Sequence, residues 1–215
     1  TSGLLVKEMM TGKAETGQGN TIDLGRAQVA VVGDNSDSRP TYADLGLAPY
    51  TDRAPDLTGK KVSCVCGGGA FSTQVQRALS RFEPASGHNW AEPFWRYASE
   101  RLGERWLQVL GYPLTEPCAV QTTIGGRAQT VLVQLFERRT LTFNPANSPA
   151  TQVEMGNVTL VLEDGPHLVL QRLVESLDVL ELVEDQDDEA LALSSDLPGQ
   201  MEDTLHDAVH VLLPL

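Results

Sequence analysis

The stretch that decides the fold is CAVQTTIGGRAQTVLVQLFERRTLTF, residues 118–143. Its apolar side chains recur with a period of two, which is the period of a β-strand. Strands are predicted at Cys118–Ile124 and Arg127–Glu137, because the two glycines between them tolerate the positive φ that a tight hairpin turn requires. A third strand is predicted at Arg139–Phe143. The pattern therefore predicts an antiparallel β-meander.

Helical patterns precede this meander. A helix is predicted over Glu92–Leu102, because Pro93 suits a first turn and apolar residues follow at helical spacing. A shorter helical turn over Trp106–Leu110 ends at Gly111. The spacing of apolar residues also predicts a helix over Phe71–Phe82. Helices followed by antiparallel strands indicate an α+β fold.

The N-terminal region reads as strands and loops. Gly3–Thr11 and Val62–Val65 are predicted strands, and so is Ala27–Val32, where β-branched residues and flanking glycines favour a strand. Residues 1–158 are predicted to form one α+β domain. The alternative division is an N-terminal β part, 1–60, and a second part, 88–158.

The formal net charge of −13 lies at one end of the chain. Residues 1–154 hold 15 basic and 15 acidic side chains, whereas residues 155–215 hold one basic and 14 acidic side chains. This distribution excludes a basic nucleic-acid-binding surface and argues against docking on anionic lipid. No apolar run approaches the roughly 20 residues of a membrane-spanning helix, so no transmembrane segment is predicted.

Residues 159–215 are predicted to form an acidic tail of two amphipathic helices, an αα-hairpin. Apolar residues recur at helical spacing on both sides of the acidic run 184–189. Each apolar stripe must be buried against something. Residues 166–213 are therefore a candidate interface for a homo-oligomer, and an assembly subunit is one alternative function.

Three cysteines, Cys64, Cys66 and Cys118, leave at least one thiol without an internal partner. Cys64 and Cys66 would point the same way on a strand, which makes them poor partners for each other. A bridge would therefore join one of them to Cys118, and Cys64–Cys118 is the pairing we expect. Three free thiols, or a Cys-X-Cys metal or redox site, are the alternatives.

Aromatic residues cluster just before the meander, with three tryptophans within the 17 positions from Trp90 to Trp106. Trp90, Trp95, Tyr97 and Tyr112 are candidates for stacking on sugar rings, because aromatic faces suit the apolar faces of sugars. The alternative is that at least two of the tryptophans pack in the core.

A metal-binding pattern occurs in the predicted last helix. His206 and His210 are four residues apart and can face one metal ion, with Glu202 on the same stripe. Asp207 takes the place of the glutamate in His-Glu-X-X-His metallopeptidases, so a zinc-dependent hydrolase is a second alternative function. The competing interpretation is the solvated flank of an acidic helix.

Other chemical patterns are incomplete. Asp34, Ser36 and Asp37 offer oxygen ligands for calcium, but their spacing does not match an EF-hand loop. No serine lies in a Gly-X-Ser-X-Gly elbow, and a turn role is enough for His88 beside Asn89. The sequence thus favours a non-enzymatic protein without a cofactor, with zinc or calcium as the alternatives.

Short motifs occur in a fixed order along most of the chain. They are GLLVKEMMTG at 3–12, FWRY at 94–97, LGYPLTE at 110–116, QLFERR at 134–139, NPAN at 144–147 and VEMGNV at 153–158. Together they resemble a family of secreted domains abundant in Chloroflexus-like filamentous bacteria. The Leu-Gly-Tyr-Pro and Phe-Glu-Arg pieces are also similar to the LGFP repeats of cell-wall-associated proteins. The resemblance covers about residues 3–158 and does not extend to the tail.

This resemblance implies an extracellular or cell-surface module, because LGFP-like repeats are thought to hold proteins to wall polymer. The chain departs from the family in having one copy, and Arg105–Val109 replaces the usual Gly-Gly before Leu-Gly-Tyr-Pro. The expected function is a non-enzymatic, secreted or envelope binding module. Its expected partner is a wall polymer, a glycan or another protein.

Overall fold

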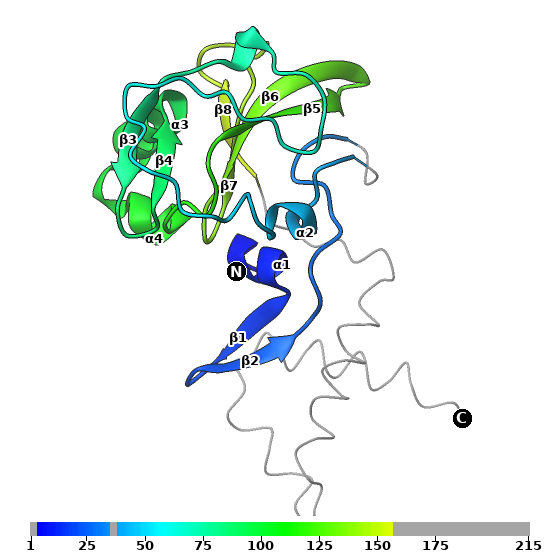
Figure 1. The fold of residues 1–215 in the computed structure, drawn as a ribbon, viewed down its shortest axis with the longest axis vertical. Coiled ribbons are helices and arrows are strands. Elements are labelled where there is room, and N and C mark those ends of the chain that lie inside the picture. The colour runs from blue at the N-terminus through cyan, green and yellow to red at the C-terminus, as the bar shows by residue number, and fades with distance from the viewer. Residues whose placement is uncertain (1–3, 35–37, 157–215) are drawn as a thin grey trace, which may run out of the picture. The chain divides into compact units, whose positions relative to one another are not determined.

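The centre of the fold is a four-stranded antiparallel sheet in the order β5-β6-β7-β8 (Figure 1). Its strands are β5 (Cys118–Ile124), β6 (Arg127–Leu135), β7 (Thr140–Phe143) and β8 (Val153–Met155). The computed structural model describes residues 4–34 and 38–156, which belong to one compact unit. The predicted domain boundary at 158, the helical tail 159–215 and the candidate interface 166–213 lie outside the described residues.

The predicted hairpin across Gly125 and Gly126 is confirmed as the pairing of β5 with β6. Ile124 pairs with Arg127 across the turn, and Gly125 and Gly126 have φ values of +59° and +71°. Only glycine adopts such angles readily, so the two glycines allow the strands to reverse direction without a longer loop. With the short helices described below, this sheet makes the fold α+β, as predicted.

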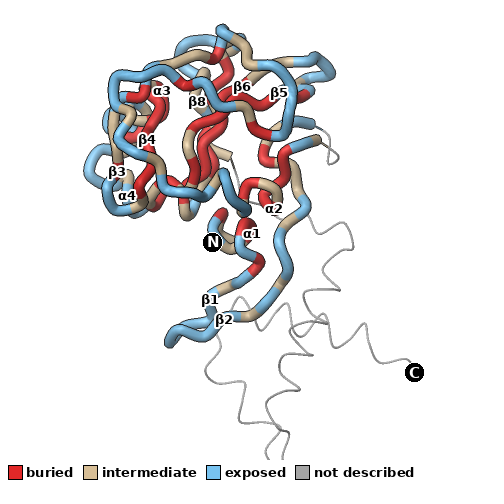
Figure 2. The backbone as a smooth tube through the Cα atoms, in the orientation of Figure 1, coloured by how far each residue is buried: buried red, intermediate tan, exposed pale blue. Residues whose placement is uncertain are grey.

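Strand β6 is buried on both faces of the sheet over its second half (Figure 2). Leu132 lies in one hydrophobic core, with Phe136 just beyond the strand, whereas Val131 and Val133 lie in the other. Because side chains alternate between faces along a strand, one apolar run supplies both cores. The sheet thus lies between two layers of helices and loops and contributes side chains to both cores.

The first core is covered by the segment that precedes the meander, which includes the two predicted helices. Its elements are η1 (Thr73–Val75), β3 (Leu79–Glu83), β4 (His88–Ala91), α3 (Glu92–Tyr97), η2 (Ala98–Leu102), η3 (Gly103–Arg105) and α4 (Trp106–Leu110). The helix predicted over Glu92–Leu102 is confirmed as α3 followed by the π-helical turn η2, with Pro93 in the first turn. The predicted turn at Trp106–Leu110 is confirmed as α4.

The second core is covered by N-terminal elements. These are α1 (Val6–Thr11), β1 (Lys13–Gly17), β2 (Asn20–Asp23) and α2 (Tyr42–Leu45). Val6, Met9 and Met10 of α1 and Leu45 of α2 are buried in this core. The β1–β2 ribbon is mostly exposed and extends away from α1 (Figures 1 and 2).

Two of the predicted N-terminal strands are wrong. Most of Gly3–Thr11 forms helix α1, because Val6, Met9 and Met10 share one helical face and the Glu8 carboxylate accepts the backbone N–H of Leu5 at 2.7 Å. Ala27–Val32 makes only an isolated bridge, between Ala30 and Thr41. The local apolar pattern could not distinguish a helix or an isolated bridge from a strand, because packing against the distant sheet determines which of them forms.

The predicted helix over Phe71–Phe82 is also wrong. Residues Thr73–Val75 form one 3₁₀ turn, and Leu79–Glu83 form strand β3, which pairs with β4. Backbone pairing between β3 and β4 prevails over the helical spacing of the apolar side chains. The predicted strand Val62–Val65 is reduced to one isolated bridge, between Val65 and Ala119.

Within the described residues, no helix is long and apolar enough to cross a membrane.

Candidate functional site

Trp90 lies at the centre of an aromatic cluster and is fully buried. Its ring centroid lies 5.5 Å from that of Trp95, 5.3 Å from that of Trp106 and 4.5 Å from that of Phe136. The prediction that Trp90 offers a surface for sugars is therefore wrong, because β4 holds this ring between the sheet and the helices. The Trp90 indole Nε1 has no hydrogen-bond partner among the described residues.

Three half-buried rings continue this cluster to the surface. The centroids of Trp95 and Trp106 are 6.0 Å apart, and those of Trp106 and Tyr112 are 6.3 Å apart. The rings come from α3, α4 and the loop after α4, and adjacent rings meet edge to face. Tyr97, also half-buried, packs against the same core. Two of the candidate residues, Trp95 and Tyr112, thus each contact Trp106, which was not a candidate.

Arg81 of β3 completes this surface. Its guanidinium carbon lies 4.3 Å from the centroid of Trp95 and 5.8 Å from that of Trp106, which are cation–π distances. Its Nη2 lies 3.1 Å from Oε2 of the buried Glu83 carboxylate. We call Arg81, Trp95, Trp106 and Tyr112 the aromatic face. Figure 1 shows β3, α3 and α4, which supply three of these residues, gathered on one side of the sheet.

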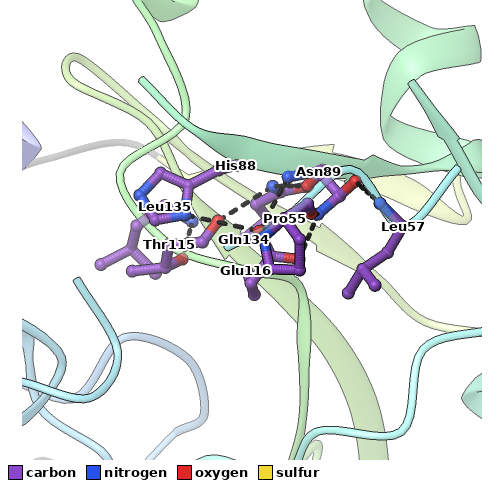
Figure 3. Close-up of polar contacts among 8 residues, drawn as sticks. All are labelled: Pro55, Leu57, His88, Asn89, Thr115, Glu116, Gln134 and Leu135. Atoms are coloured by element: carbon purple, nitrogen blue, oxygen red, sulfur yellow. Dashed lines mark hydrogen bonds and ion pairs between the residues drawn. The ribbon is translucent and has the colours of Figure 1, made fainter. Parts of the chain in front are cut away.

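Asn89, the residue before Trp90, is the centre of a buried polar network (Figure 3). The backbone N–H of Asn89 donates to Oε1 of Glu116 at 2.7 Å, and its side-chain amide donates to Oε2 of Glu116 at 3.1 Å and to the carbonyl of Pro55 at 2.9 Å. The amide oxygen of Asn89 accepts the backbone N–H of Leu57 at 2.8 Å. This one side chain therefore fixes the loop at 55–57 against Glu116.

Gln134 extends the network into the sheet. Its side-chain amide donates to the carbonyl of Asn89 at 2.7 Å and to the carbonyl of Thr115 at 3.0 Å. The hydroxyl of Thr115 accepts the backbone N–H of Leu135 at 3.2 Å. The Thr-Glu pair that follows Leu-Gly-Tyr-Pro thus ties β4 to β6, which gives these motif residues a structural role.

His88 is buried in β4 rather than in a turn, which corrects the expectation for this residue. Its Nδ1 lies 3.4 Å from Oε1 of Glu116 but does not form a hydrogen bond in the described structure. The Glu116 carboxylate is already occupied by three hydrogen bonds from Asn89. The arrangement therefore suits a structural acceptor better than a carboxylate that moves protons.

The disulfide joins Cys66, and not Cys64, to Cys118, with 5.6 Å between the Cα atoms. The prediction of Cys64–Cys118 is wrong because residues 62–66 are not a regular strand, so Cys64 is exposed while Cys66 is buried. The backbone N–H of Cys66 donates to the carbonyl of Ala119, and the backbone N–H of Ala119 donates to the carbonyl of Cys64. Partial burial raises the pKa of the Cys64 thiol above its ordinary 9.0, and the Glu116 carboxylate raises it further.

The predicted metal ligands are not assembled in the described part of the chain. Asp34 accepts the backbone N–H of Gly126 at 3.3 Å, which is a turn contact. Ser36, Asp37 and the predicted zinc ligands Glu202, His206 and His210 lie outside the described residues. Across residues 4–34 and 38–156, no group of three or more His, Cys, Asp or Glu side chains is placed to hold a metal ion.

Two important residues were missed at the sequence level. Arg81 fell within a segment predicted to be helical, so its place beside the tryptophans was not expected. Gln134 is a polar residue inside the apolar run VLVQLF, residues 131–136, and that position was a usable signal. A buried polar side chain in a core strand requires partners, and its presence predicts a network.

Comparisons with protein-family models, curated proteins and solved structures find no match to this chain. The resemblance to secreted envelope domains stays a prediction. The aromatic face and the polar network beside it are therefore the grounds on which a function can be argued.

Proposed function

We propose that residues 4–156 form a non-enzymatic module that binds a wall polymer or related glycan outside the cytoplasm. The observation that carries this proposal is the set of half-buried rings of Trp95, Trp106 and Tyr112 at one surface. Such rings offer an apolar face together with a polar N–H or O–H group. A sugar ring presents the complementary combination of C–H groups and hydroxyls.

The support beneath the rings favours binding by a pre-formed surface. Trp90 packs edge to face against both Trp95 and Trp106, and it is itself held against Phe136 of the sheet core. The half-buried rings of Trp95 and Trp106 therefore lose little freedom when a ligand stacks on them. A smaller entropic cost of ordering leaves more of the contact energy as affinity.

The polar network supports a binding role over a catalytic one. His88 is the single histidine of the described residues, and the carboxylate nearest to it, Glu116, is held by Asn89. A general base needs a carboxylate or imidazole free to reach the substrate. Here both groups face into the protein.

The disulfide supports a location outside the cytoplasm. Bonds such as Cys66–Cys118 persist in oxidising compartments and are rare where thiols are kept reduced. This inference is independent of the resemblance to secreted domains, and it leads to the same expectation.

Co-sedimentation of the full chain with purified cell-wall sacculi, and affinity electrophoresis in soluble glycans, test the proposal. We expect Trp106→Ala to weaken binding by about tenfold or more, since loss of a stacking ring removes on the order of 1–3 kcal/mol. Tyr50→Ala is the matched control, because Tyr50 is a half-buried ring packed on the second core. A wild-type chain that binds none of these polymers, or a folded Trp106→Ala chain that binds as wild type does, would contradict the proposal.

A further inference from the structure

We propose that the aromatic face selects acidic glycans and that Arg81 is the residue that recognises their negative charge. This inference rests on the proposed function and adds the class of ligand to it. The chemistry in question is a sugar that carries a carboxylate or a phosphate.

Arg81 lies at the point where a stacked sugar would carry its substituents. Its guanidinium is over the ring of Trp95 and close to that of Trp106. A sugar that stacks on Trp106 is therefore a neighbour of the cation. The Arg81 side chain keeps 37% of its surface exposed, so its charge is available to a ligand.

The aromatic face holds more hydrogen-bond donors than acceptors. A guanidinium carries five N–H donors in a planar fork, and the ion pair with Glu83 uses only one edge of it. Among the described residues Arg81 Nη1 forms no hydrogen bond, and Arg81 Nε is buried without an acceptor. A surface of this kind favours ligand groups that only accept hydrogen bonds, as carboxylates and phosphates do.

The ion pair with Glu83 positions the arginine and does not cancel its role. Glu83 is buried with 8% of its side chain exposed, whereas Arg81 reaches solvent. The Glu83 carboxylate contacts only Nη2, so the rest of the partly exposed guanidinium remains for a ligand. The cation–π contact with Trp95 holds the guanidinium over the ring, which reduces its freedom before binding.

The experiment measures binding of the full chain to three soluble polymers of similar length. These are polygalacturonate for carboxylate, a phosphorylated dextran for phosphate and unmodified dextran for a neutral chain. We expect the wild type to bind at least one acidic polymer about tenfold more tightly than dextran, a preference that falls with added salt. We expect Arg81→Gln to lose this preference and to keep the affinity for dextran.

Two further variants make the result decisive. Arg81→Lys keeps the charge without the fork and should retain part of the preference, which also provides a measurement if Arg81→Gln does not fold. Arg127→Gln removes an exposed positive charge at the β5–β6 turn and should leave the preference unchanged.

Equal affinity of the wild type for all three polymers would overturn the inference while the proposed glycan function stands. An equal loss in Arg81→Gln and Arg127→Gln would overturn it too, because net charge alone would explain the preference. Binding to no polymer and to no sacculi would instead contradict the proposed function. Preference for carboxylate over phosphate, or the reverse, supports the inference and identifies the source of the charge.

Discussion

At the scale of single residues, Asn89 connects more of the structure than its place in a short motif indicates. It is completely buried, and its backbone and side chain contact the loop at 55–57, Glu116 and the side chain of Gln134. Because Asn89 itself is out of reach of water, each contact satisfies one of its own buried polar groups. Removal of this side chain would leave the backbone N–H of Leu57 and the carbonyl of Pro55 without it, and would leave Glu116 with only the backbone N–H of Asn89 as a donor among the described residues.

We predict that Asn89→Ala lowers the free energy of unfolding by roughly 2–4 kcal/mol, because buried groups left without partners cost more than the lost bonds return. Urea denaturation of the full chain measures this change. Asn147→Ala is the control, since the amide of Asn147 makes two longer bonds at the surface and should cost under about 1 kcal/mol. Similar losses in the two variants would contradict the role assigned to Asn89.

The aromatic residues show what could and could not be predicted at this scale. The clustering of tryptophans was visible in the sequence, and Trp95 and Tyr112 do lie in one surface. Which ring would be covered was not visible, because Trp90 belongs to a strand whose pairing with β3 was missed. The same limit applies to the cysteines, where the irregular backbone at residues 62–66 determines that Cys66 faces the core.

At the scale of elements, the meander was predictable and the N-terminal helix was not. The strands β5, β6 and β7 combine a two-residue period with a glycine turn, so local chemistry and tertiary pairing agree. Helix α1 has only six residues, too few for periodicity to separate a helix from a strand. Its burial against β6, more than a hundred residues away, selects the helix.

Helix α2 is a short element whose stability should depend on pH. The Asp44 carboxylate accepts hydrogen bonds from the backbone N–H of Thr41 at 2.8 Å and from its hydroxyl at 2.9 Å. The bond from the Thr41 backbone, with smaller effects of its hydroxyl and of Arg39, lowers the pKa of Asp44 below its ordinary 3.8. The folded state thus gains stability from this group above pH 3.8 and loses it as pH falls through the lowered pKa.

We predict that Asp44→Asn lowers the free energy of unfolding by up to about 1 kcal/mol at pH 7, because a neutral amide accepts the Thr41 hydrogen bonds more weakly than a carboxylate and does not pair with Arg39. The difference between variant and wild type should shrink as the pH falls below 3.8, because the wild-type carboxyl then becomes neutral as well. Urea titrations at several pH values measure both quantities. A difference that stays constant from pH 7 to the acid limit would contradict the assignment.

At the scale of the whole molecule, the sheet separates two cores and the disulfide links an irregular loop to its first strand. Cys66 and Cys118 are 52 residues apart, and both side chains are buried in the second core. The intervening residues include most of the elements that cover the first core. The cross-link therefore closes a large loop that contains the aromatic face.

We predict that the double variant Cys66→Ser with Cys118→Ser loses about 2–4 kcal/mol of unfolding free energy, because a loop of this length is costly to close without the bond. Cys64→Ser should be near neutral, since this thiol is free. Peptide mapping under non-reducing conditions tests the pairing directly. Recovery of a Cys64–Cys118 peptide would contradict the assigned bridge.

The central claim is that Trp95 and Trp106 contact a glycan, and the indole signals of the protein test it most directly. The full chain contains three tryptophans, so its nitrogen–proton correlation spectrum should contain three indole signals that single Trp→Phe variants can assign. We expect oligogalacturonate to shift the signals of Trp95 and Trp106 in a saturable manner. If both signals stay in place while affinity electrophoresis shows the same soluble glycan bound, the glycan binds elsewhere and the account is contradicted.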